Sequence, residues 1–124
     1  GAVALSIAHD SHNIIVVGVS DEEMEFAVNS LIAQEGGMVL VREGKVLESM
    51  PMPIAGLMSD QSGEWVDEKL TAIHAKAYEE LGIAGDVEPV MTLCFMSLAV
   101  IPEVKLTDMG LFDVTTFSFI PVEA

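Results

Sequence analysis

The chain has 124 residues, 51% of them hydrophobic, which is enough apolar material for one domain with a sizeable core. Its formal net charge of -15, with five basic against 20 acidic residues, argues against partners such as nucleic-acid phosphate or an anionic membrane surface. A single cysteine excludes an internal disulfide, and no apolar run reaches the roughly 18 residues of a membrane-spanning helix, so we expect a cytoplasmic protein.

Two apolar segments near the start, residues 3–9 and 13–19, are rich enough in β-branched side chains to predict strands. The polar residues His9–Asn13 lie where these segments meet, so they form a loop or the ragged ends of both strands. A helix is predicted next, because Ser20-Asp21-Glu22-Glu23 is a capping box and Gly36-Gly37 is a stop signal. Its apolar positions recur at helical spacing: Met24, Ala27, Val28, Leu31 and Ile32.

A hairpin is predicted from two apolar stretches, 38–41 and 46–50, that flank a turn containing Gly44. A second helix follows, with its cap at Asp60 or Ser62 and its end at about Leu81. Its apolar face is formed by Val66, Leu70, Ile73, Ala77 and Leu81.

The last third of the chain gives weaker signals. Residues 91–100 are a buried apolar run, either a strand or a short helix, and residues 114–122 alternate as a strand does. Cys94 lies inside the apolar run, so we interpret it as a buried, inert thiol. The polar segment Lys105–Asp108 reads as an ordinary connection, with a second contact loop as the alternative.

This order of elements predicts an α+β domain that comprises residues 1–124. The two amphipathic helices each need an apolar surface to cover, and a mixed, largely antiparallel sheet is the available partner. We expect both helices to pack on one face of that sheet.

The run Ser6–Asn13 gathers imidazoles, a carboxylate, hydroxyls and an amide just before a strongly apolar stretch. Such groups transfer protons and form hydrogen bonds, and His titrates nearest neutrality. A metal site of its own needs three or four convergent ligands, which His9, Asp10 and His12 cannot easily supply at such short spacing, so no metal site is predicted. The alternative is a loop whose side chains only satisfy backbone groups.

The sequence resembles the C-terminal domain of bacterial adenine deaminase, of the amidohydrolase superfamily. The resemblance extends from about residue 4 to about residue 121, and it rests on four blocks in the same order: Ser6–Asn13 with Val16-Val17-Gly18, Pro51–Asp60, Met91–Phe95 and Ile101–Leu111. Two positions depart from the pattern, since Cys94 stands where serine is common and Met109 where arginine is common.

The resemblance implies hydrolytic deamination of adenine to hypoxanthine and ammonia by a longer enzyme. In that family a metal-activated hydroxide, with manganese or iron, acts at the mouth of a (β/α)₈ barrel that precedes this domain. No cofactor is then expected in this domain, and the isolated chain is predicted to be inactive. The partners implied are adenine, the N-terminal barrel of the same protein and further copies in a homo-oligomer.

Within that framework, the loop is predicted to reach the active site of the barrel. His9, Asp10 and His12 are the candidate catalytic residues, as substrate contacts or a proton shuttle, and Ser11 and Asn13 are the candidate substrate-binding residues. One alternative is a structural or oligomerisation domain with no direct catalytic role. Another is a stand-alone module that binds a small molecule.

Overall fold

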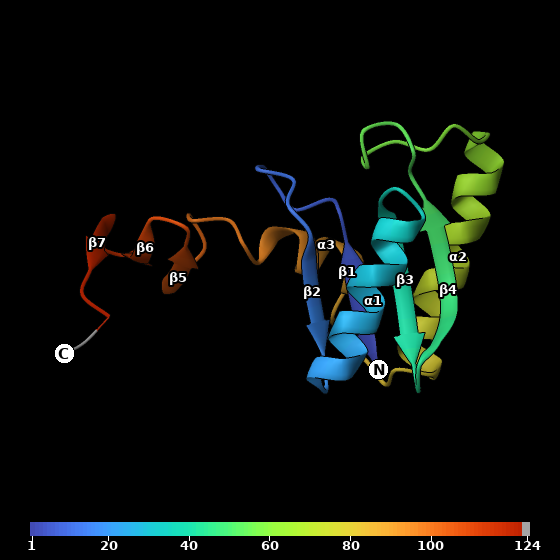
Figure 1. Cartoon of the computed structure of the whole chain (residues 1–124), viewed down its shortest axis with the longest axis horizontal. Coiled ribbons are helices and arrows are strands. Elements are labelled where there is room, and N and C mark those ends of the chain that lie inside the picture. Colours follow the sequence, from blue (N-terminus) through green and yellow to red (C-terminus); the bar gives the residue numbers. More distant parts are fainter. Residues whose placement is uncertain (123–124) are drawn as a thin grey trace.

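The computed structural model describes residues 1–122 and contains two antiparallel sheets and three helices (Figure 1). The elements in chain order are β1 Ala2–Leu5, β2 Ile15–Gly18, α1 Asp21–Ala33, β3 Gly37–Arg42, β4 Lys45–Pro51, α2 Gly63–Glu79, α3 Pro89–Phe95, β5 Val104–Thr107, β6 Gly110–Asp113 and β7 Ser118–Ile120. The predicted α+β class is confirmed. Within the described residues, no helix has both the length and the apolar character needed to cross a bilayer.

The larger sheet has the strand order β2-β1-β3-β4, and every neighbouring pair in it is antiparallel. The expectation of a largely antiparallel sheet is therefore confirmed, and the expected mixed character is not found in this sheet. Strand β1 lies in the interior of the sheet and all four of its residues are buried. Its run of apolar residues is typical of a strand covered on both faces, because neither side of it needs polar side chains.

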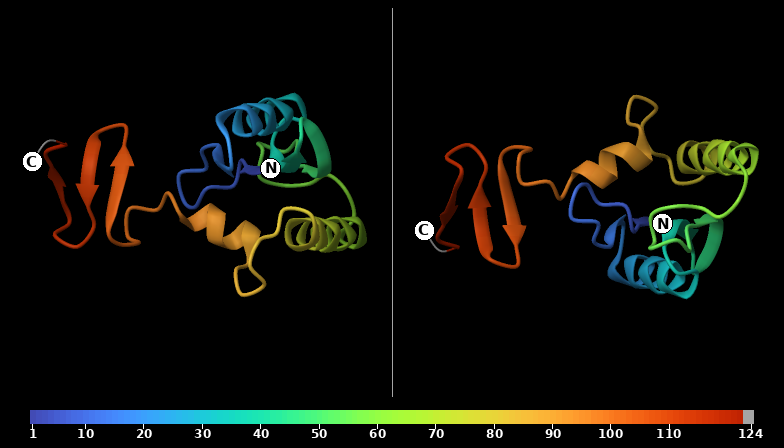
Figure 2. Two further views of the ribbon diagram at one scale, coloured as in Figure 1. Left: turned by 90° about the horizontal axis from the view of Figure 1, so that it is seen from below. Right: turned by 90° about the horizontal axis from the view of Figure 1, so that it is seen from above.

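The two long helices cover opposite faces of this sheet, so the expectation that both pack on one face is wrong (Figure 2). On one face, Ala2 and Ala4 of β1 join Ala27 and Leu31 of α1. On the other face lies a larger cluster, made from β1, β3, β4, α2 and α3: Val3, Leu5, Met38, Leu40, Met50, Met52, Ile73, Ala77, Val90, Leu93 and Cys94. The physical reason is that successive side chains of a strand point to opposite faces of the sheet. In β1 and β3 the side chains on both faces are apolar, so each face must be covered.

The predicted first helix is confirmed, including its cap. The Ser20 hydroxyl accepts a hydrogen bond from the Glu23 amide at 3.3 Å, and the helix ends at Ala33, shortly before Gly36 and Gly37. Gly37 has a φ of 107°, and a Cβ there would lie 2.0 Å from the Met50 carbonyl oxygen. The start of β3 therefore requires glycine, because the backbone of Gly37 lies against the backbone at the end of β4, with which it pairs.

The predicted hairpin and second helix are also confirmed. The hairpin turn contains Glu43 and Gly44, both with positive φ. Helix α2 is capped by Ser62, whose hydroxyl accepts from the Trp65 amide at 3.3 Å, so Ser62 and not Asp60 is the cap.

The apolar run after residue 90 is a helix, α3, and not a strand. Pro89 occupies its first turn, where a missing N–H costs nothing, and the Glu88 carboxylate accepts from the Met91 amide. Cys94 is buried in the larger cluster. Burial, together with the negative charge of Glu88, raises the pKa of the Cys94 thiol, consistent with an inert side chain.

The second sheet, β5-β6-β7, lies at the far end of the molecule from α2 (Figure 1). The predicted strand over 114–122 is only partly confirmed, since β7 comprises Ser118–Ile120. The interpretation of Lys105–Asp108 as a connection is wrong, because residues 104–107 are strand β5. Among the described residues, no side chain after Cys94 is buried.

Candidate functional site

The loop His9–Asn13 connects β1 to β2, and all five of its side chains are exposed. A turn shapes the loop, since the His12 amide donates to the carbonyl oxygen of the buried Ala8 at 2.6 Å. The Asn13 side-chain amide donates to the Ser11 hydroxyl at 3.2 Å. Ser6, which precedes the loop, has a structural role: its hydroxyl accepts from the Gly37 amide at 2.7 Å and donates to the Gly56 carbonyl.

Helix α3 holds His9 in place. The His9 amide donates to the Cys94 carbonyl oxygen at 2.8 Å, and its ring stacks on Phe95 with centroids 4.8 Å apart and an interplanar angle of 23°. Both contacts come from the last turn of a helix whose inner side is buried in the core. The imidazole thus has one face covered by an aromatic ring and is tied to the core through its backbone.

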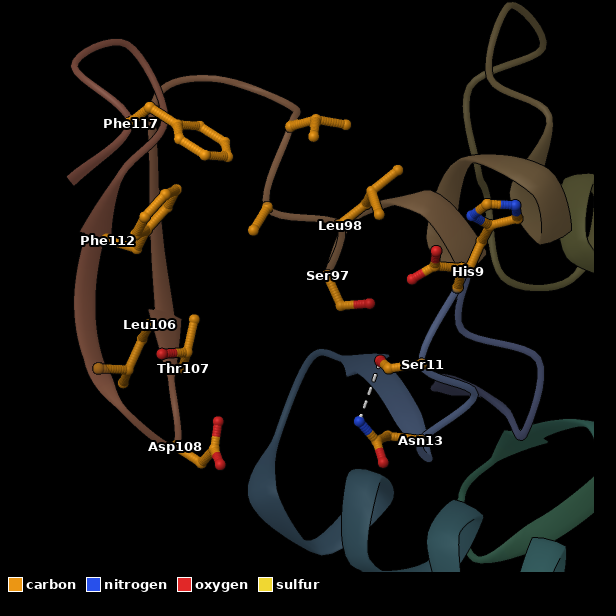
Figure 3. Close-up of a pocket in the computed structure, with 13 residues that line it drawn as sticks. His9, Ser11, Asn13, Ser97, Leu98, Leu106, Thr107, Asp108, Phe112 and Phe117 are labelled. Carbon is orange, nitrogen blue, oxygen red and sulfur yellow. Dashed lines mark hydrogen bonds between the residues drawn. The ribbon is translucent and has the colours of Figure 1, made fainter. Parts of the chain in front are cut away.

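A cleft of about 890 Å³ separates this loop from the second sheet (Figure 3). Its floor is the segment 97–100, which links α3 to β5. The residues that line it are His9, Asp10, Ser11, Asn13, Ser97, Leu98, Ala99, Val100, Leu106, Thr107, Asp108, Phe112 and Phe117.

Four of the five predicted site residues line this cleft together: His9, Asp10, Ser11 and Asn13. His12 does not line it. The His12 ring lies edge-on to the His9 ring, with centroids 6.5 Å apart and an interplanar angle of 67°.

The opposite wall of the cleft comes from residues that the sequence analysis did not assign to the site, although its alternative of a second contact loop over Lys105–Asp108 included Asp108. Asp108 contributes a second carboxylate, and Phe112 and Phe117 meet edge to face at 5.2 Å between centroids. A signal for this wall was present, because apolar and polar residues alternate over Val104–Thr107 and Gly110 follows after two intervening residues, a pattern typical of a hairpin.

The chemistry of the cleft is acidic and aromatic. Its described lining contains the carboxylates of Asp10 and Asp108, the imidazole of His9, and no lysine or arginine. Carboxylates accept hydrogen bonds from N–H groups, while aromatic rings and aliphatic side chains contact flat apolar faces. The arrangement suits a flat ligand that carries hydrogen-bond donors and disfavours an anionic ligand.

The donor set does not fit a bound metal ion. Within residues 1–122, no group of three or more His, Cys, Asp or Glu side chains converges. His74 belongs to α2 and pairs through its Nε2 with Glu88.

Comparisons with known proteins identify the family. The model of the adenine deaminase C-terminal domain matches residues 1–118. Adenine deaminase 2 of Desulfotalea psychrophila is 75% identical over 124 residues, which cover this whole chain and 22% of that protein. The adenine deaminase of Halalkalibacterium halodurans is 54% identical over 97% of this chain, and that of Bacillus subtilis is 47% identical over 99%; these matches cover 20% and 21% of the two proteins. The chain thus spans about a fifth of the length of these relatives, and it belongs to the adenine deaminase C-terminal domain family.

Proposed function

We propose that this chain is the C-terminal domain of an enzyme that hydrolyses adenine to hypoxanthine and ammonia. In that reaction the oxygen of water forms a bond to the ring carbon that carries the amino group, and the bond from that carbon to the amino nitrogen breaks. The nitrogen leaves as ammonia once it has received a proton. The cleft beside the His9–Asn13 loop, which brings four predicted polar residues together, is the observation that carries the proposal.

The chemistry of adenine matches the lining of the cleft. Adenine is flat and uncharged and carries N–H donors, which the carboxylates of Asp10 and Asp108 accept. The Asn13 side chain both donates and accepts, so it suits the ring nitrogens. We assign to Asp10, Ser11 and Asn13 the binding of the purine edge.

His9 is the proposed proton carrier of this set. The nitrogens of an imidazole ring can donate and accept a proton, and Phe95 and the Cys94 carbonyl fix the position of His9. Such a group delivers a proton to a departing amine when it lies within hydrogen-bond reach of it. We therefore propose that His9 donates a proton to the amino nitrogen, which then leaves as ammonia.

The proposal extends to the whole enzyme. Manganese or iron, held by an N-terminal barrel outside this chain, would supply an activated water, and no step here depends on a metal bound by the described residues. The full-length protein is proposed to be a cytoplasmic homo-oligomer, which light scattering and cell fractionation would test. The isolated chain is proposed to be inactive.

The test is kinetics of the full-length enzyme with His9→Ala and Asp10→Ala. Loss of a general acid typically lowers a rate on the order of 10²-fold or more, so we expect His9→Ala to reduce kcat by at least that factor. Asp10→Ala is expected to raise KM. Metal content, measured by elemental analysis, is expected to stay unchanged in both variants.

His12→Ala is the matched control, because it removes the same side chain from the same loop at a position that does not line the cleft. We expect it to lower kcat much less than His9→Ala does. Equal losses for both histidines, or unchanged kinetics for His9→Ala and Asp10→Ala, would overturn the catalytic role. The unchanged case would leave the structural or oligomerisation role as the function of this domain.

A further inference from the structure

One apolar face of the second sheet has no other described part of the chain packed over it. The strand register places Leu106, Leu111 and Ile120 side by side on one face, with Val104 on the same face. We call this set the outer apolar face. Leu106 is 81% exposed and Val104 is 45% exposed.

The second sheet lacks a packed hydrophobic face, which is the usual source of stability for a small sheet. Three strands hold together in water when a hydrophobic face is packed against something, and no side chain of β5–β7 is buried. The described members of the two core clusters all lie within residues 2–95, so both clusters end before this sheet begins. A contiguous apolar patch of this kind on a folded protein marks an interaction surface.

We propose that the outer apolar face is the docking surface for the N-terminal part of the same polypeptide. The proposal rests on the proposed function only in assuming that this chain, like its relatives, is joined to a much longer N-terminal part. The relatives are about five times the length of this domain, so most of each protein lies outside the residues described here. A tethered partner binds intramolecularly, at an effective concentration on the order of millimolar for a short flexible linker, which favours it over a partner in free solution.

Charge disfavours the main competitor, a second copy of this chain. Each copy carries a formal charge of -15, so two copies repel one another. The edge of the outer apolar face is also acidic, since Asp113 pairs with Val104 and Asp108 lies in the adjoining turn. The complementary surface is therefore apolar at its centre and basic at its rim.

The position of Leu106 links this docking to the cleft. Leu106 belongs to the outer apolar face and also lines the cleft. A partner that covers Leu106 therefore lies at the border of the cleft. Docking would bring the N-terminal part beside the loop His9–Asn13.

The experiment measures thiol accessibility in the native full-length protein. Leu106→Cys and Val104→Cys each introduce one thiol on the outer apolar face, and Val104 does not line the cleft, so a small bound ligand cannot cover it. Ile32→Cys is the control, because Ile32 is 57% exposed on α1. The proteins are reacted with a maleimide, and the modified peptides are quantified by mass spectrometry over time.

We expect the thiols introduced by Leu106→Cys and Val104→Cys to react at least tenfold more slowly than that introduced by Ile32→Cys. Equal rates at the three positions would overturn the proposal. Protection that disappears on dilution, together with a change in molar mass, would assign the surface to a second copy and overturn it as well. The readout needs no catalysis, so it separates failure of this proposal from failure of the proposed function.

Discussion

The two sheets of this chain are built from similar short apolar strands, yet their surroundings differ. The first sheet lies between α1 on one face and α2 with α3 on the other, and β1 is buried along its whole length. The second sheet has no helix over it and buries none of its described side chains. The first sheet thus has a core made by this chain, whereas the second sheet has none among the described residues, in line with the docking surface proposed above.

A matched pair of leucine truncations gives the largest expected effect. Leu40 is fully buried in the first sheet, and Leu106 is 81% exposed in the second. Because truncation of a buried leucine leaves a cavity, Leu40→Ala is expected to lower the free energy of unfolding by about 2–5 kcal/mol. Leu106→Ala is expected to change it by less than about 0.5 kcal/mol in the 124-residue chain, since surface substitutions have small effects.

Urea denaturation followed by circular dichroism measures both changes. The comparison fails if the two variants lose similar stability. Repeating Leu106→Ala in the full-length protein sharpens this comparison. There a docked second sheet is expected to bury Leu106, so the substitution would lower the free energy of unfolding more than in the 124-residue chain.

A second pair compares two hydroxyl groups that each accept from one amide and donate to one carbonyl. Ser6 joins β1 to Gly37 and to Gly56, and these partners lie 31 and 50 residues along the chain. Thr107 only closes a local turn, with Met109 and Gly110. Ser6→Ala is expected to cost about 1–3 kcal/mol, because it leaves a part-buried amide without its partner.

Thr107→Val keeps the side-chain shape and is expected to cost less than about 1 kcal/mol, because both hydrogen bonds that it removes lie within one local turn. Thermal unfolding of the two variants measures the difference. A larger loss for Thr107→Val than for Ser6→Ala would show that the second sheet contributes more to the isolated fold than its exposure indicates.

The smallest expected effect concerns two carboxylates as pH falls. For Glu48 of β4, partial burial acts to raise the pKa, but hydrogen bonds from Lys69 of α2 and the Ser49 amide outweigh it and hold the pKa below its ordinary 4.5. Hydrogen bonds from the Thr115 amide likewise hold the pKa of Asp113 below its ordinary 3.8. A lowered pKa means that the stabilisation is present above the ordinary value and is lost as pH falls through the lowered one.

For Glu48, which joins a strand to a helix, loss of this ion pair is expected to lower the free energy of unfolding by about 0.5–1 kcal/mol. For Asp113 only local opening of the turn between β6 and β7 is expected. Carboxyl chemical shifts recorded against pH measure the pKa values of Glu48 and Asp113, with Glu48→Gln as the control for the assignment. Urea denaturation of the wild-type chain and of Glu48→Gln at each pH measures the change in the free energy of unfolding. A titration midpoint of Glu48 above 4.5 would contradict the assignment.

Local patterns in the sequence predict most of the first region. The capping serines Ser20 and Ser62, the glycines after α1 and the hairpin turn each act on neighbouring residues, so the sequence reveals them directly. The placement of the helices on opposite faces depends on packing across the sheet. The run of apolar residues in β1 was the available signal for a strand covered on both sides.

Of the two walls of the cleft, the sequence predicted the loop His9–Asn13 and did not predict the wall from the second sheet. The loop His9–Asn13 is a dense local cluster, but the contact of His9 with Phe95 joins residues far apart in sequence. The wall formed by Asp108, Phe112 and Phe117 needed the β5–β6 hairpin to be recognised first. The exclusion of His12 from the lining follows from the turn geometry of the loop, which composition does not encode.

Helix α3 carries a consequence for how this domain can change. Leu93 and Cys94 lie in the core, the next residue supports the His9 ring, and Ser97 already lines the cleft. The cleft and the core are therefore built on the same few residues. Selection for heat resistance that repacks the core beneath α3 is therefore expected to move the cleft as well.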